Sequence, residues 1–276
     1  MFEDVPDELV KRVVRIPDEY KAAKYAAAAF EAVEHYANLR LHENMFASFQ
    51  IHNTDTTDLR LIEIGAWLFS PRNDSIMPEL ISRLHTKDKL RSAFFEISAA
   101  AFCKRLGYIV VQGPGIQKKG LDFDFVIEDG SAKVNVEVTE LRAEAFDVPR
   151  AIGSLDNKRK QLPRDAPAIL ICYLPFSWRD DDASFRSDLD QLADGFFRNS
   201  RRINALCFSM EQFVPGTRSV SVYYATFLNG GARHPSSRLD EALHGYYAAL
   251  SAVPTHGDTT SGPIYEFKQW VDSLIP

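Results

Sequence analysis

Residues 121–140, LDFDFVIEDGSAKVNVEVTE, place acidic side chains on both halves of a segment that is otherwise typical of a β-hairpin. Two runs rich in β-branched and aromatic residues flank a turn at residues 128–130. Asp122 and Asp124 come early in the first run, and Glu137 lies in the second. Carboxylates that share one face of adjacent strands cost free energy unless a cation or a proton neutralises them. This spacing therefore predicts a two-strand carboxylate site for a divalent cation.

The second run has one apolar and one polar face. Alternate residues of a strand share a face, so the valines at positions 134, 136 and 138 lie on one side. Glu137 and Thr139 are neighbours on the other side, together with Asn135. The polar face of this strand is therefore where we expect the chemistry.

The elements around the hairpin are also predictable. Residues 89–108 have the apolar spacing of a helix, with Gly107 at the position of a C-cap glycine. A short strand at 108–111 is ended by Gly113-Pro114-Gly115. After the hairpin, a helix that holds residues 158–162 precedes a strand at 168–174. The expected order is a helix, three strands, a helix and a strand.

This order, and the positions of its acids, resemble the PD-(D/E)XK nuclease superfamily, the restriction-endonuclease-like fold, over residues 89–174. Leu121-Asp122 stands where the family has Pro-Asp, and Glu137-Val138-Thr139 stands where it has Glu-x-Lys. The resemblance implies that Asp122 and Glu137 bind Mg²⁺ (or Mn²⁺), with the backbone carbonyl of Val138 as a third ligand. Asp124 has the same strand parity as Asp122 and is the secondary candidate for the aspartate.

Thr139 departs from the family pattern, because it stands at the catalytic position where the family has a lysine. A threonine hydroxyl carries no charge at neutral pH, so a lysine of the site must come from elsewhere. The resemblance points first to Lys158 on the following helix and then to Lys160. Lys133 shares the parity of Glu137, but it lies roughly 13 Å back along the strand and is the weaker choice.

Further residues are candidates through the same resemblance. Glu96 matches an acidic residue that many members hold on the first helix, where it could bind a metal-bound water or a second ion. Alternatively, Glu96 is the partner of a nearby Arg or Lys. Lys158 and Gln161 match a Lys or Gln that the family often has on the helix after the glutamate strand. The residues expected to contact substrate are Lys118, Lys119, Lys160 and Gln161.

The net charge of −6 argues mildly against a strong nucleic-acid binder. A nuclease needs only a local basic rim for phosphates, and Lys118-Lys119, Arg164 and Arg201-Arg202 are among the candidates for it. The three cysteines form no CxxC pair, which predicts free thiols in a reducing compartment. The start, MFEDVPDELV, is acidic, and no apolar run is long enough to span a bilayer. We therefore expect a cytoplasmic protein that has no membrane partner.

The chain divides by pattern into three parts. Residues 1–85 form a mostly helical N-terminal extension, residues 86–228 form the nuclease-like core, and residues 229–276 form a helical tail that packs on the core. Strands at 203–210 and 219–228 should join the main sheet, with helices at 239–250 and 265–274 after them. The expected fold class is α/β, with a central mixed β-sheet flanked by helices.

The expected function is metal-dependent hydrolysis of phosphodiester bonds, in DNA more than in RNA, and a homodimer would fit it. The alternative is a nuclease-fold protein that has lost catalysis and binds nucleic acid or a protein partner. A third interpretation is an unrelated α/β domain on which the acids are only surface charge. Asp122 and Glu137 on opposite sides of the sheet would favour this third interpretation.

Overall fold

The computed structural model describes residues 2, 4–16, 21–38, 50–51, 54–55, 57–86, 89–114, 122–130, 132–142, 146–175, 178, 182–214, 219–244, 247–251 and 265–274. The chain divides into two compact units. The first comprises Met1–Arg105, Phe213–Ser221 and Leu250–Pro276, and the second comprises Leu106–Gln212 and Val222–Ala249.

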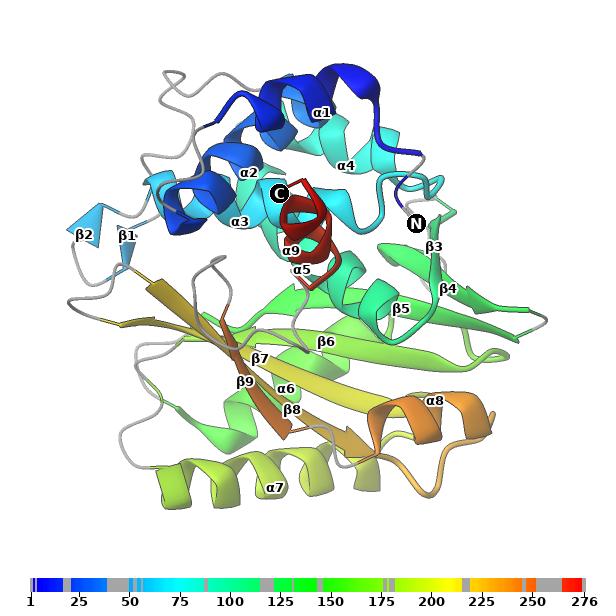
Figure 1. Cartoon of the computed structure of the whole chain (residues 1–276). Coiled ribbons are helices and arrows are strands. Elements are labelled where there is room, and N and C mark those ends of the chain that lie inside the picture. Colours follow the sequence, from blue (N-terminus) through cyan, green and yellow to red (C-terminus); the bar gives the residue numbers. More distant parts are fainter. Residues whose placement is uncertain are drawn as a thin grey trace. The chain divides into compact units, whose positions relative to one another are not determined.

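The first unit is mainly helical (Figure 1). Its core is aromatic where the helix Tyr265–Ser273 meets the helix Thr57–Phe69. There the Phe69 ring stacks on the Trp270 ring with 4.8 Å between their centroids. Arg72 joins the same region through ion pairs to Asp4 at 2.8 Å and to Glu266 at 2.7 Å. Its elements are α1 (Asp7–Val14), α2 (Lys21–Ala37), β1 (Gln50–Ile51), β2 (Thr54–Asp55), α3 (Thr57–Phe69), α4 (Met77–Leu84), α5 (Leu90–Arg105) and α9 (Tyr265–Ser273).

The second unit is built on an open seven-stranded sheet whose spatial order follows the chain order. The strands are β3 (Ile109–Gln112), β4 (Phe125–Asp129), β5 (Ala132–Glu140), β6 (Ala168–Leu174), β7 (Ala205–Val214), β8 (Ser219–Leu228) and β9 (Tyr247–Ser251). β3, β4 and β5 pair antiparallel, whereas β5, β6 and β7 pair parallel. Parallel neighbours need long crossovers, which α6 (Val148–Arg159) and α7 (Asp182–Arg198) supply, and α8 (Ser237–Leu243) follows β8. The expected α/β class with a central mixed sheet flanked by helices is confirmed.

The core of the second unit lies between α6 and α7 and one face of this sheet (Figure 1). β6 is buried along its whole length, and its alternate residues Leu170 and Cys172 belong to this core. Leu155 of α6 and Leu192 and Phe196 of α7 pack against them. Full burial of such side chains contributes about 1.5–3 kcal/mol each to the free energy of unfolding. This burial fixes which face of the sheet α6 covers.

Most of the expected elements are present within a few residues of their predicted ends, and Gly107 has the positive φ of +88° that favours glycine. Two expectations were wrong. The helix expected at 239–250 is α8, which ends at Leu243, and residues 247–251 form β9. β4 begins at Phe125, so Asp122 and Asp124 precede the strand instead of lying within it.

The two units divide the chain differently from the expected boundaries after residues 85 and 228. α5 belongs to the first unit, where Phe94 packs on Trp67 of α3 with 5.1 Å between ring centroids. α9 belongs to the same unit because Trp270 packs on Phe69. Among the residues that the structure describes, no helix is long and apolar enough to cross a membrane.

Gly65 of α3 allows a close approach to α2. A Cβ at residue 65 would lie 2.0 Å from the carbonyl oxygen of Ala29, which is backbone and cannot swing aside. We expect Gly65→Ala to lower the free energy of unfolding by about 1–3 kcal/mol or more, since overpacking shifts the backbone. Gly153 of α6 is the matched control, because a Cβ there would meet nothing within 4 Å. Gly153→Ala should raise stability by up to about 1 kcal/mol, and urea unfolding of both variants tests the contrast.

Candidate functional site

Glu137 is a buried acid in the middle of β5, and only 2% of its side chain is accessible. It pairs in the sheet with Leu170 of β6. Paired residues of adjacent strands point to the same face, so Glu137 lies on the face that α6 and α7 cover. Its Oε1 accepts a hydrogen bond of 2.7 Å from the Nζ of Lys158. A buried carboxylate is thus neutralised by a helix residue that lies 21 positions later in the chain.

Lys158 reaches Glu137 because of where α6 starts and which side of it is buried. The side chain of Asp147 caps the helix by accepting the backbone N–H of Arg150 at 2.7 Å. Leu155 is buried on the core side, and Lys158 lies three positions further along, on the same side of the helix. The ammonium side chain is 37% accessible, so its stem packs against the sheet while its head meets both Glu137 and solvent.

Asp124 is the carboxylate that the structure places beside β5. β4 begins at Phe125, which pairs with Val136, and Asp124 is the residue before it. The backbone N–H of Asp124 donates to the carbonyl of Val136 at 3.1 Å. In return, Oδ2 of Asp124 accepts the backbone N–H of Val138 at 2.7 Å. The Asp124 carboxylate therefore takes the place of a backbone carbonyl at the end of the β4–β5 ladder.

Gly113 lets the end of β3 come close to this aspartate. A Cβ at residue 113 would lie 2.7 Å from the carbonyl oxygens of both Phe123 and Asp124. Both of these contacts are to backbone atoms, so any side chain at residue 113 would displace the segment that carries Asp124. The turn signal at Gly113-Pro114-Gly115 predicted a break, but it gave no sign of this contact.

Asp122 and Gln161 are joined through the backbone, because the N–H of Asp122 donates to the carbonyl of Gln161 at 3.2 Å. Gln161 lies just beyond the end of α6, and its N–H donates to the carbonyl of Lys158 at 2.9 Å. The side-chain Oε1 of Gln161 is buried and has no hydrogen-bond partner among the described residues. The two residues predicted from the sequence, Lys158 and Gln161, are thus linked by backbone bonds to the segment that holds Asp122 and Asp124.

The other predicted residues have different surroundings. Thr139 pairs with Cys172 on the same face as Glu137, whereas Lys160 follows α6 and its Nζ donates to Asn157 Oδ1 at 2.9 Å. Lys133 is 70% accessible and pairs with Glu128 across the hairpin at 2.5 Å. Lys118 and Lys119 lie outside the described residues.

Glu96 belongs to the first unit, in α5. Of the two interpretations of this residue, the structure shows the ion-pair partner: its Oε2 accepts from Nη1 of Arg83 at 2.6 Å.

The surrounding acids keep Lys158 charged. Burial opposes the ammonium and on its own would lower the pKa of Lys158. The charge and hydrogen bond of Glu137, together with the charges of Asp124 and Asp122, outweigh burial and raise that pKa above its ordinary value. At neutral pH, Lys158 is therefore a proton donor and a positive charge, and it cannot act as a general base.

The donor set suits one kind of cation. The backbone groups of Val136 and Val138 that bond to Asp124 both face β4, and the Val138 carbonyl faces the same side by the alternation of the ladder. Asp124, Glu137 and this carbonyl are all oxygen donors. Mg²⁺ takes oxygen ligands, usually only one or two of them protein carboxylates, and it keeps several waters. The set holds no Cys or His, the ligands that structural zinc sites use, and within the described ranges no three His, Cys, Asp or Glu side chains form a group that could hold a metal.

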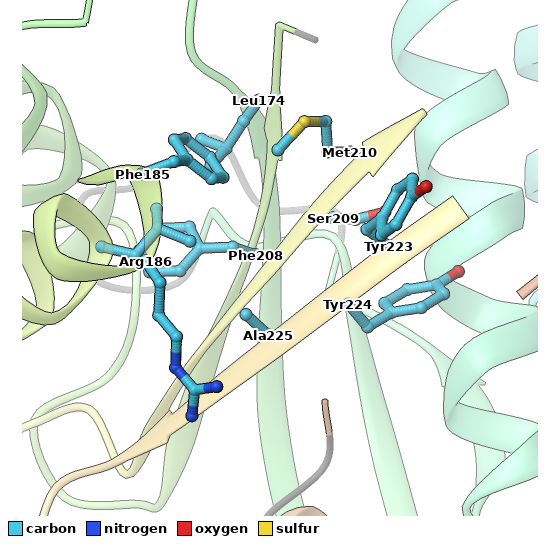
Figure 2. Close-up of a pocket in the computed structure, with 10 residues that line it drawn as sticks. Leu174, Phe185, Arg186, Phe208, Ser209, Met210, Tyr223, Tyr224 and Ala225 are labelled. Carbon is cyan, nitrogen blue, oxygen red and sulfur yellow. The ribbon is translucent and has the colours of Figure 1, made fainter. Parts of the chain in front are cut away.

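A cavity elsewhere in the second unit has a different chemistry. It lies between α7, the end of β6 and strands β7 and β8, and it encloses about 360 Å³, part of which is open to solvent. Figure 2 shows Leu174, Phe185 and Phe208 gathered beside α7, with Arg186 extending toward β8 near Ala225. The described residues that line this cavity include no carboxylate, so they offer no ligand set for a cation.

Comparisons with known proteins add little to this geometry. No model of a known protein family matches the chain, and no curated protein sequence is similar to it. The solved structure of the central domain of yeast acetyl-CoA carboxylase is similar with a TM-score of 0.37 and 10% sequence identity over 75% of this chain. This chain spans only 34% of the length of that one. The inference about function therefore rests on the site itself.

The two Lys–Glu pairs of β5 make a matched test of burial. Lys158→Met leaves Glu137 buried without its cation, so we expect a loss of about 1–3 kcal/mol in unfolding free energy, less than for a fully enclosed pair. Lys133→Met breaks an exposed pair and should change stability little.

The contribution of Lys158 should depend on pH in a defined direction. Because its folded-state pKa is raised above the ordinary value of 10.5, the contribution is complete below that pH and is lost as pH rises through the raised pKa. Urea unfolding of wild type and Lys158→Met across alkaline pH measures it. A stability difference that does not shrink at high pH would contradict the assignment.

Proposed function

We propose that this chain is a metal-dependent nuclease of the PD-(D/E)XK type, which hydrolyses phosphodiester bonds in DNA in preference to RNA. The observation that carries the proposal is the 2.7 Å hydrogen bond between Lys158 and buried Glu137, next to Val138, whose backbone N–H donates to the carboxylate of Asp124. This arrangement supplies, from α6, the ammonium that Thr139 cannot supply. The fold class and the order of elements support the same interpretation.

Asp124 and Glu137 would hold Mg²⁺ or Mn²⁺, with the Val138 carbonyl as the third protein ligand. Asp122 is the alternative aspartate, but it is exposed and the main-chain contacts to β5 are made by Asp124. When bound, the ion would stabilise the negative charge of the phosphoryl group and lower the pKa of a water.

The residues of the chain itself have three tasks in this proposal. Lys158, held protonated, orients the attacking water and offsets negative charge that develops on the phosphate. Glu137 fixes the position of that ammonium through their hydrogen bond. Asp124 is held by the backbone of β5, so its carboxylate is oriented before any ligand binds.

The proposal includes a cellular compartment and binding partners for the protein. The three cysteines, at positions 103, 172 and 207, are buried free thiols, which supports a reducing compartment such as the cytoplasm. Nucleic acid is the proposed partner, and a homodimer would allow both strands of a duplex to be cut.

The second candidate is a nuclease-fold protein that binds nucleic acid or a protein without cutting. Two observations favour it: Thr139 stands where the family has its lysine, and Lys158 forms an ion pair with Glu137. An ion pair of this kind can serve structure alone.

Cleavage assays separate the two candidates. Plasmid, linear and single-stranded DNA and RNA would be incubated with Mg²⁺, with Mn²⁺ or with EDTA. We expect cutting that needs the metal, and a loss of at least about 100-fold in Glu137→Gln, Asp124→Asn and Lys158→Met, since each removes an electrostatic contact to the reacting groups. Asp122→Asn should retain more activity than Asp124→Asn.

Two variants control for general damage to β5. Glu140→Gln and Lys133→Met change an acid and a lysine of the same strand that pair with Arg142 and Glu128, and both should cut like wild type. Folded wild type that cuts no substrate with either metal would favour the binding protein. Activity that survives Lys158→Met would discard the relocated lysine and keep the metal site.

A further inference from the structure

Three loops at one end of the sheet of the second unit are tied together by two asparagines. The loops are residues 160–167 before β6, 199–204 before β7 and 229–236 after β8. Buried Asn204 accepts the N–H of Ala168 at 3.0 Å and donates to the carbonyl of His234 at 2.7 Å. The Asn229 amide donates to the carbonyls of Ser200 and Ile203, each at 2.8 Å. The three loops therefore form one ordered surface.

Arginines from all three loops, and from the end of α6, come together on this surface. Nη1 of Arg202 donates to the carbonyls of Arg159 at 3.3 Å and Leu162 at 3.5 Å. The His234 ring bonds to the carbonyl of Arg164 at 3.1 Å. The backbone N–H of Arg233 donates to the carbonyl of Arg201 at 2.7 Å. We call this set the arginine cluster: Arg159, Arg164, Arg201, Arg202 and Arg233.

The cluster has little compensating negative charge. Residues 159–167, 199–204 and 229–236 contain six Lys or Arg residues and one acid, Asp165, in a chain whose net charge is −6. Arg159 pairs with Asp156 at 3.1 Å. Within the described part of the chain, no ion pair with an acid is formed by Arg164, Arg201, Arg202 or Arg233.

Burial and the crowding of these cations both lower the pKa of Arg202. Burial first, and then the charges of Arg164, Arg159 and Arg233, lower the pKa of Arg202. Its bonds to the carbonyls of Arg159, the last residue of α6, and of Leu162 just beyond it give Arg202 a structural role, because cations are favoured at a helix C-terminus. That role does not extend to Arg164 and Arg233, which are exposed and add to the repulsion. Guanidinium groups gathered in this way are suited to phosphate, which each can bind through two parallel hydrogen bonds.

We propose that the arginine cluster binds the phosphate backbone of a nucleic acid strand and holds it against the candidate site. The choice of a nucleic acid as the ligand rests on the proposed function. The cluster begins at Arg159, the residue after Lys158, and Arg202 bonds to Leu162, the residue after Gln161, whose carbonyl accepts the N–H of Asp122. A strand that lies on the cluster therefore runs beside the backbone that carries the candidate acids.

Binding without cutting tests this proposal. Fluorescence anisotropy with a short labelled DNA duplex, in EDTA, would give affinity as a function of salt for the full chain. Each lost phosphate contact on duplex DNA lowers the slope of log affinity against log salt by about 0.9. Arg164→Gln/Arg233→Gln should lower it by about 2 and weaken binding roughly tenfold or more near physiological salt. This variant leaves the Arg202 hydrogen bonds in place, and adding Arg202→Gln should lower the slope further.

A control matched to the triple cluster variant removes three positive charges elsewhere in the unit. Lys133→Gln/Arg142→Gln/Arg150→Gln takes away three cations outside the cluster and should keep the wild-type slope. An unchanged slope in the cluster variants, an equal fall in the control, or no binding by wild type even at low salt would overturn the proposal. Binding that depends on the cluster, in a protein that cuts nothing, would reject the nuclease and keep the cluster. Metal-dependent cutting with an unchanged slope in the cluster variants would keep the nuclease and reject the cluster as its phosphate-binding surface.

Discussion

A carboxylate enclosed between a sheet and its covering helices must have a cation beside it, and the pairing of Glu137 with Lys158 meets this requirement. Leaving that acid unpaired is expected to cost about 1–3 kcal/mol, a sizeable part of the roughly 5–15 kcal/mol net stability of a domain. The pair therefore fixes the position of α6 as well as that of its own two side chains. It sets the C-terminal turn of α6 against β5, and so it sets the last part of the crossover that leads into β6. The polar face of β5 can lie over an apolar core only because α6 brings its lysine to that point.

Asp124 is held in a different way, by hydrogen bonds to the backbone of β5. Asp124 comes before β4, and its side chain completes the ladder where the backbone has stopped pairing regularly. Gly113 leaves the room for this, because the backbone of residues 123 and 124 passes where a Cβ would otherwise lie. The two candidate acids are thus positioned by main-chain bonds and by a buried ion pair instead of by long, mobile side chains. Such fixed donors need little reorganisation when a ligand arrives.

The strongly patterned elements could be predicted from the sequence. α5, β5, β6 and α7 have long periodic or unbroken apolar runs, and Lys158 followed from the resemblance to a nuclease family. The register of the hairpin was not predicted, because the turn was placed at residues 128–130. Asp129 in fact pairs with Ala132, and this register ends at the pair of Phe125 with Val136, directly after Asp124. The packing of α5 and α9 in the first unit, and the gathering of arginines from three loops, depend on contacts between distant segments. Local pattern carries no information about such contacts.

The mixed pairing of the sheet has a consequence for the order of folding. β4 and β5 are joined by a tight turn, so this hairpin can close on the microsecond timescale. β5 and β6 are parallel, so they can pair only when the chain between them, which contains α6, has crossed over. Contacts between distant residues form late because closing the loop between them costs entropy. Asp124 and Glu137 can therefore meet early, while Lys158 joins them only when the crossover docks. A chain that emerges from the ribosome up to residue 140 would have the acids of the site but not its ammonium.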